Sequence, residues 1–247
     1  MLIFTTCKPF CGEAEINQRA AFDNWSQMGI PVLVYGEGQG IARAAMRYGF
    51  CHVPDIACNK DGVPFIEAMF HGAEVASYDD VLLYTNCDIL FHGLQEAVGV
   101  VRRSLNEFLI IGQRRDFTGK IPTDFTTDEW YSDLKARSRL HSICGIDYFV
   151  FTRGLWPSIP AFVVGYPSFD NWLVADALKR KKNVVDATGM ITAFHPDHGD
   201  RHGGATEQGA KNRKLATKNY ELVDGFTACA QWTLNDYILG HRFKTER

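Results

Sequence analysis

The stretch Val81-Leu82-Leu83-Tyr84-Thr85-Asn86-Cys87-Asp88-Ile89 carries an apolar strand directly into a polar turn. Residues 81–84 are apolar on both faces, as is typical of a central strand in a parallel sheet that is covered on both sides. Two further strands, Leu2–Thr6 and residues 31–36, precede it, with a helix at residues 13–28 between them. Repeated strand–helix–strand units predict a right-handed, doubly wound α/β sheet.

The rest of the chain extends this alternation, regularly at first and less regularly later. Residues 113–141 are polar and aromatic without sustained periodicity, and so long a connection inside a compact domain is usually functional or mobile. We expect helices at Ile41–Tyr48, 64–76, 168–182, 207–220 and 229–239, and strands at 51–56, 108–112, 146–152 and, as one or two strands, 184–194.

The overall composition limits the partners of the protein. The chain has 247 residues, of which 46% are hydrophobic, and this size suits one domain, with or without an appendage. A net charge of −3 without a basic stripe argues against nucleic acid as a partner. No apolar stretch approaches the roughly twenty residues of a membrane span. We read the N-terminus as a core strand and the seven scattered cysteines as free thiols in a reducing cytoplasm.

Asn86 and Asp88 follow the apolar strand at the edge where open α/β sheets bind their ligands. They are two residues apart, so on an extended backbone both side chains point the same way. A carboxylate and an amide oxygen together suit a hard cation such as Mg²⁺ or Mn²⁺. The alternative is a strand-end turn in which Asp88 caps the next segment.

Asp170 lies near the start of the helix at 168–182, on the same face as the apolar residues 173, 174 and 177. A carboxylate there is either a helix cap, worth about 1 kcal/mol, or an acid/base group that faces a cleft. Ser168 already offers a capping oxygen, which weakens the first interpretation. The helix dipole favours the ionised form, whereas burial raises the pKa of the carboxyl towards that of a useful base.

Two further clusters could carry chemistry. His195-Pro196-Asp197-His198-Gly199-Asp200-Arg201-His202 follows a strand, and its histidines are either metal ligands or parts of a solvated loop. His195 is nearest the strand end and is our candidate ligand, whereas we interpret His202 as part of the loop. Arg114 and Arg115 either clamp a phosphate or acidic acceptor or pair with Asp116 at the surface.

Taken together, these segments resemble the GT-A fold nucleotide-diphospho-sugar transferases, particularly a little-characterised branch described as glycosyltransferase-like. The resemblance implies a three-layer α/β sandwich with a mostly parallel central sheet. It implies a catalytic domain over residues 1–200, with 201–247 as a helical extension packed on the same domain. The segments that carry it are 4–10, 18–25, 59–64, 85–89 (Thr-Asn-Cys-Asp-Ile), 111–114, 145–151, 165–173 (containing Phe-Asp-Asn-Trp) and 185–198.

The resemblance implies roles for the metal and the base. The family's metal motif is usually Asp-x-Asp, and Asn86 here replaces the first Asp. Asp88 is therefore the more secure ligand of Mn²⁺ or Mg²⁺, and Asn86 would reach the ribose, or the metal through water. The family's histidine ligand maps onto His195, with His198 as the competitor. Asp170 corresponds to the catalytic base of inverting members.

The resemblance also implies where the two substrates lie. Arg114, which already suggested a clamp for an acidic acceptor, remains a candidate on the acceptor side together with Asp147, Asn171 and Trp172. The donor's base and ribose would face the end of the first strand and a nearby turn, comprising Thr5, Thr6, Asn59, Asp61 and Gly62.

The sequence thus predicts a metal-dependent glycosyltransferase. It would move a sugar from a nucleotide-diphospho-sugar, with UDP as the default nucleotide, to a hydroxyl of a glycan or another acceptor with inversion. Residues 113–141 would order over the bound donor. A sugar-phosphate nucleotidyltransferase is the alternative enzyme, although residues 7–12 match its Gly-rich loop poorly. A non-catalytic nucleotide-sugar-binding module and a metal hydrolase built on His195, His198 and His202 are the remaining alternatives.

Overall fold

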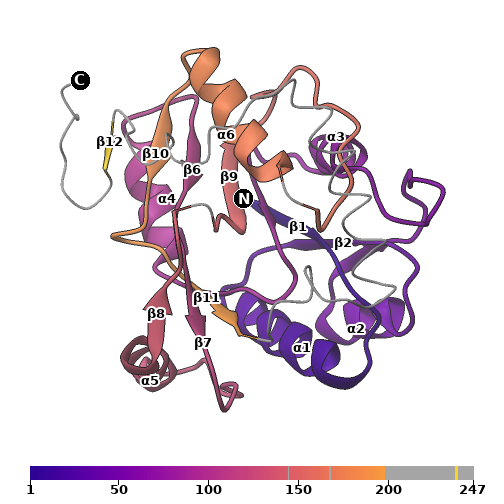
Figure 1. The fold of residues 1–247 in the computed structure, drawn as a ribbon, viewed down its shortest axis with the longest axis vertical. Coiled ribbons are helices and arrows are strands. Elements are labelled where there is room, and N and C mark those ends of the chain that lie inside the picture. The colour runs from indigo at the N-terminus through magenta and orange to yellow at the C-terminus, as the bar shows by residue number, and fades with distance from the viewer. Residues whose placement is uncertain (144, 167, 198–236, 239–247) are drawn as a thin grey trace.

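An eight-stranded sheet forms the centre of the fold (Figure 1). The computed structural model describes residues 1–143, 145–166, 168–197 and 237–238. The strand order is β12-β10-β6-β9-β4-β1-β2-β3. Five neighbouring pairs are parallel, and β9 runs antiparallel to both β4 and β6. The strands are β1 (Leu2–Thr6), β2 (Val32–Tyr35), β3 (Cys51–Val53), β4 (Val81–Thr85), β6 (Leu109–Ile111), β9 (Tyr148–Thr152), β10 (Val184–Asp186) and β12 (Tyr237–Ile238).

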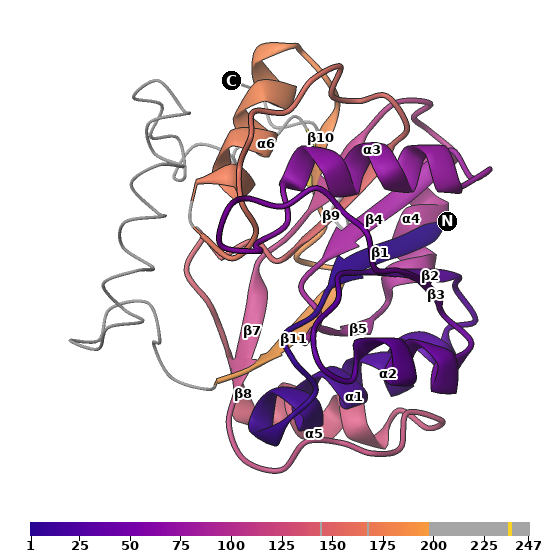
Figure 2. The same cartoon turned by 90° about the vertical axis from the view of Figure 1, so that its right-hand side faces the viewer.

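Helices cover both faces of this sheet and make three layers (Figure 2). On one face, α1 (Gly12–Gln27), α2 (Ile41–Tyr48) and α4 (Leu94–Arg102) share a hydrophobic core with Leu83 of β4. On the other face, α3 (Ile66–Ala76) and α6 (Phe169–Lys179) pack around Leu82. Successive residues of β4 therefore feed two different cores, which explains why this strand is apolar on both faces. The predicted mostly parallel three-layer fold is confirmed.

A second, four-stranded sheet lies beside the carboxyl ends of the parallel strands of the first sheet (Figure 2). Its strand order is β5 (Leu90–His92), β11 (Thr192–Pro196), β7 (Arg114–Phe117) and β8 (Ser138–Leu140). Helix α5 (Glu129–Arg137) packs below it, where Trp130 and Tyr131 contact Phe194. Across the strands His195 is paired with Asp116, and Asp116 with Arg139. These three residues therefore form one row on the same face of the small sheet.

The structure also differs from the sequence expectations in places. Residues 113–141 contain β7, α5 and β8, although their pattern showed no periodicity. The expected helix at 64–76 begins two residues later, at Ile66, because Phe65 is extended and Pro64 pairs with Cys58 in an isolated bridge. The expected strand region 184–194 is two strands, β10 and β11, which belong to different sheets.

Of residues 198–247, the structure describes two, Tyr237 and Ile238. Tyr237 and Ile238 form β12, which pairs in parallel with β10, whereas the sequence placed these two residues in a helix. The expected helix at 207–220 and the rest of the proposed extension at 201–247 lie outside the described residues. Within the described part of the chain, no helix combines the length and apolar character needed to cross a bilayer.

Candidate active site

Carboxylates from three segments of the chain gather at the C-terminal end of β4. Tyr84 is fully buried there, and this burial raises the pKa of its hydroxyl. The negative charges of Asp147, Asp170 and Asp88 raise this pKa further. Such an influence requires proximity, so the fold brings together residues that are up to 82 positions apart in the sequence. This is the edge at which the sequence predicted a site.

Asp88 and His195 face each other across the junction of the two sheets. Asp88 follows β4, and His195 lies in β11, with 3.7 Å between Asp88 Oδ2 and His195 Nε2. Their side chains are 16% and 10% exposed. Ligands of Mg²⁺ lie about 2.0–2.1 Å from the ion, so two ligands of one ion are at most about 4.2 Å apart. The separation and the donor atoms therefore fit a shared divalent cation.

Two protein ligands leave most of a cation's coordination sphere to other groups. Among the residues that the structure describes, no cluster of three or more His, Cys, Asp or Glu side chains could hold a metal ion. A cation that Asp88 and His195 hold alone would take its remaining ligands from water or substrate, as Mg²⁺ usually does at phosphate sites. His198, the competing candidate ligand, lies outside the described residues.

Asp116 joins His195 to a buried network of charges. Arg114 Nε donates to Asp116 Oδ1 over 2.9 Å, and His141 Nδ1 lies 2.5 Å from Asp116 Oδ2. Burial alone would raise the pKa of the Asp116 carboxyl, but the hydrogen bond from His141 and the charge of Arg114 outweigh it and lower this pKa. His195 Nδ1 lies 3.8 Å from Asp116 Oδ1. Asp116 is therefore held as a carboxylate next to the candidate metal ligand.

Arg114 connects this network to the other side of the site. Its Nη1 donates to Asp147 Oδ2 over 2.8 Å, and Asn86 Nδ2 donates to Asp147 Oδ1 over 2.5 Å. Arg114 does pair with Asp116, as one interpretation of the sequence had it, but the pair is buried rather than at the surface: the two side chains are 20% and 8% exposed. Asn86 was expected to point with Asp88 towards the ribose or the metal, and the structure shows its amide bonded to Asp147.

Asp170 is the candidate base, and it lies in the first turn of α6. Burial raises the pKa of its carboxyl to about 6, and the negative charge of Asp147 adds to this rise. The backbone N–H groups of Asn171 and Ser168 donate to Asp170 Oδ1 over 2.9 and 3.1 Å and oppose part of the rise. Asp170 thus takes part in capping the helix and is also a carboxyl with a base-like pKa. Ser168 was expected to cap with its hydroxyl, but the residue makes no side-chain cap bond.

Two polar side chains lie within two residues of Asp170 in the sequence. Ser168 Oγ and Asn171 Nδ2 are buried and have no hydrogen-bond partner among the described residues. Buried polar atoms of this kind usually bind water or a ligand. Trp172 is half-buried and packs on Phe162 with 5.5 Å between the ring centres. Asn171 and Trp172 directly follow the candidate base in α6, and the charge of Asp147 acts on its carboxyl; contact of these residues with an acceptor stays a prediction.

The expected nucleotide-binding residues belong to two segments. Thr5 is fully buried, and its hydroxyl donates to the carbonyl of Thr85 over 2.7 Å, whereas Thr6 at the end of β1 is half-buried. Asn59 Oδ1 accepts the backbone N–H groups of Asp61 and Val63, which closes the turn that sequence analysis expected. Asp61 and Gly62 are exposed on this turn. Contact of these residues with a nucleotide stays a prediction.

Sequence reasoning missed two members of the network. Asp116 was interpreted as a possible surface partner of Arg114, and His141 was taken as the end of an irregular connection. A usable signal was the two-residue spacing of Arg114 and Asp116, which places both on one face if the segment is a strand. The charged composition of Arg114–Phe117 hid that strand.

No protein-family model matches the sequence, and neither does any curated protein. Solved structures do match, and the chain has the GT-A fold of the nucleotide-diphospho-sugar transferases.

Three of the similar structures come from mycobacteria. Glucosyl-3-phosphoglycerate synthase from Mycobacterium tuberculosis in complex with phosphoglyceric acid is 15% identical with a TM-score of 0.54, covering 92% of this chain and 81% of the synthase chain. The same synthase with Mn²⁺, UDP-glucose and phosphoglyceric acid is 15% identical with a TM-score of 0.53, and the match covers 92% of this chain and 80% of the synthase chain. A structure described as a mycobacterial protein is 16% identical with a TM-score of 0.50, and the match covers 90% of this chain and 74% of that protein's chain. Identities this low show a shared fold.

Proposed function

We propose that this protein is a metal-dependent glycosyltransferase that moves a sugar from a nucleotide-diphospho-sugar to a hydroxyl acceptor with inversion. One observation carries the proposal. Asp88 and His195, 107 positions apart in the sequence, face each other 3.7 Å apart at the edge of the sheet, and the charges of Asp88 and Asp170 both act on Tyr84 of β4. Such a transfer needs a cation for the leaving group and a carboxylate that accepts a proton.

The donor end of the site is formed by Asp88 and His195. Both side chains are largely buried, and their oxygen and nitrogen atoms suit Mn²⁺ or Mg²⁺. A cation bound there would offset the negative charge that develops on the leaving nucleoside diphosphate. We propose UDP as the nucleotide, because a structure of similar fold holds UDP-glucose and Mn²⁺. Thr6 and the turn with Asn59, Asp61 and Gly62 would then face the base and ribose. Thr5 would act indirectly, because its hydroxyl links β1 to the carbonyl of Thr85 in β4.

The acceptor end is formed by Asp170 and its neighbours. In its ionised form the Asp170 carboxylate accepts the proton of the attacking hydroxyl, and a pKa of about 6 leaves it ionised at neutral pH. The buried Asn171 Nδ2 offers a donor to the acceptor, and Trp172 offers an apolar surface. Arg114 keeps Asp147 in place with its Nη1, while its Nε donates to Asp116. Its Nη2, which makes no hydrogen bond to a described residue, would face the acceptor.

Product analysis tests the proposal. The protein is incubated with Mn²⁺ and a panel of nucleotide-sugars and hydroxyl acceptors, and products are followed by mass spectrometry and by NMR of the anomeric proton. We expect release of the nucleoside diphosphate together with a glycoside of inverted configuration. Asp79→Asn changes an exposed carboxylate that precedes β4, at the end of this strand opposite to Asp88, and this control should keep full activity. Pyrophosphate release from a nucleoside triphosphate and a sugar phosphate, or a product of retained configuration, would contradict the proposal.

A further inference from the structure

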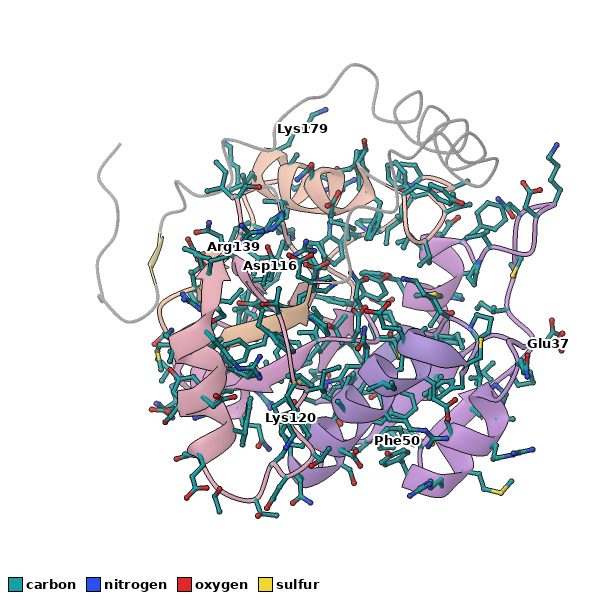
Figure 3. The ribbon with its side chains drawn as sticks, turned by 60° about the horizontal axis from the view of Figure 1, so that its bottom comes forward. Glu37, Phe50, Asp116, Lys120, Arg139 and Lys179 are labelled. Carbon is teal, nitrogen blue, oxygen red and sulfur yellow. The ribbon has the colours of Figure 1, made fainter. Side chains whose placement is uncertain are left out.

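Asp116 is a buried carboxylate in the small sheet, and the proposed chemistry does not use it directly. We infer that Asp116 is a positioning residue that fixes the ring of His195, so that its Nε2 faces Asp88 and the cation. This inference rests on the proposed function, because it concerns the same cation site. Figure 3 shows Asp116 on the small sheet near Arg139, the next residue in the same row.

The backbone places the two side chains next to each other. His195 of β11 and Asp116 of β7 are direct partners in a parallel pair, so both side chains leave the same face of the sheet. Both residues are buried, with 8% and 7% exposure. Their positions are therefore set by regular strand pairing, which is more exact than a loop would be.

The two nitrogens of the His195 ring face different carboxylates. Nε2 lies 3.7 Å from Asp88 Oδ2, and Nδ1 lies 3.8 Å from Asp116 Oδ1. At 3.8 Å the contact with Asp116 is electrostatic rather than a direct hydrogen bond. A carboxylate beside Nδ1 favours the tautomer with its proton on that nitrogen, which leaves the Nε2 lone pair for the metal side.

Asp116 is itself held from two directions. Arg114 Nε donates to its Oδ1 over 2.9 Å, and His141 Nδ1 lies 2.5 Å from its Oδ2. These contacts come from β7 itself and from the residue that follows β8, so they prevent the carboxylate from turning away from His195. A metal-binding histidine commonly has such a carboxylate partner, and loss of the partner typically weakens metal binding roughly 10- to 100-fold.

Metal binding tests this inference without an activity assay. Mn²⁺ affinity is measured in the presence of UDP, and electron spin-echo spectroscopy of bound Mn²⁺ detects the nitrogen of a coordinating imidazole. We expect Asp116→Asn to weaken Mn²⁺ binding roughly 10- to 100-fold and to reduce the nitrogen signal. Asp128→Asn is the matched control, because Asp128 makes the same kind of contact with His92, at 3.7 Å, while being 87% exposed.

Further variants separate positioning from a purely structural role. His141→Gln removes one of the two supports of Asp116 and leaves the other, from Arg114, so we expect it to weaken Mn²⁺ binding and the nitrogen signal less than Asp116→Asn does. In a double-mutant cycle with His195→Ala, the effects should be non-additive if Asp116 acts through His195. Should Asp116→Asn fail to fold, the folded His141→Gln variant replaces it as the test, and an unchanged Mn²⁺ affinity with an unchanged nitrogen signal in that variant would overturn the inference.

The results also separate this inference from the proposed function. A wild-type protein that binds no Mn²⁺ with UDP would overturn both. A wild-type protein that binds Mn²⁺ with a nitrogen signal, while Asp116→Asn binds it equally with an unchanged signal, would overturn the inference about Asp116 and leave the glycosyltransferase proposal standing.

Discussion

The two sheets of this protein contribute to the site in different ways. The large sheet is built from strands such as β4 and β9, which are buried along their whole length, and Asp88 and Asp147 lie just beyond or before these strands. The small sheet carries His195, Asp116 and Arg114 within its strands. The large sheet thus stabilises the fold and offers polar groups at its edge, whereas the small sheet holds charged groups in regular strand positions.

The largest expected effect lies on the large-sheet side, at Asp170 of α6, the proposed base. Asp170→Asn keeps the shape of the side chain and its two backbone hydrogen bonds but cannot accept a proton. We expect the turnover rate to fall roughly 10³-fold, while Mn²⁺ and UDP bind as in the wild type. Steady-state kinetics together with calorimetry measure both. The matched control is Asp176→Asn on the same helix, where the carboxylate pairs with Arg180. Unchanged turnover in Asp170→Asn would exclude this residue as the base.

A smaller effect is expected in the backbone of the small sheet. Strands β7 and β8 have four and three residues, and their mutual pairing is at the rim of that sheet. We expect their amides to exchange hydrogen faster than those of β1, β4 and β9. Mn²⁺ with a nucleotide-sugar should slow exchange across residues 113–141. Hydrogen-exchange mass spectrometry measures the two sheets in one experiment. Equal exchange in residues 113–141 with and without donor would contradict an ordering of this segment over the donor.

The smallest effect is on stability and follows from the pKa of Asp170. Because burial raises this pKa to about 6 in the folded protein, from about 3.9 in an unfolded chain, the folded state binds the proton more tightly. Its stabilising contribution is fully present below about pH 4 and is lost as the pH rises through about 6. Asp170→Asn should therefore melt at a higher temperature than the wild type at pH 8, with the difference vanishing near pH 4. Thermal melts of both proteins across this pH range measure the difference. A reversed or pH-independent difference would contradict the raised pKa of Asp170 in the folded state.

The large sheet was predictable because its residues follow simple patterns. Residues 81–84 are apolar on both faces, and the short helix expected around residues 41–48 forms at Ile41–Tyr48. The small sheet was not predictable in this way. In Arg114–Phe117 a strand is formed by three charged residues and one aromatic residue, because its charges pair with each other inside the site instead of facing water. A sequence prediction that treats every charged residue as exposed to solvent misses such a strand.

The same contrast holds for the site residues. Asp88, Asp170 and His195 could be selected from the sequence because each lies near the end or start of a recognisable element. The partners of these residues could not, because they depend on tertiary pairing. The amide of Asn86 bonds to Asp147, and Asp116 joins His195 to Arg114, through contacts between segments far apart in the chain.

The central claim is that Asp88 and His195 together hold one divalent cation. Calorimetric titration of Mn²⁺ into the protein with UDP, for the wild type, Asp88→Ala and His195→Ala, tests it most directly. The account predicts one Mn²⁺ per chain in the wild type, no measurable binding in Asp88→Ala, and strongly weakened binding in His195→Ala, with folding preserved in all three. Unchanged Mn²⁺ affinity in folded Asp88→Ala protein would contradict the account.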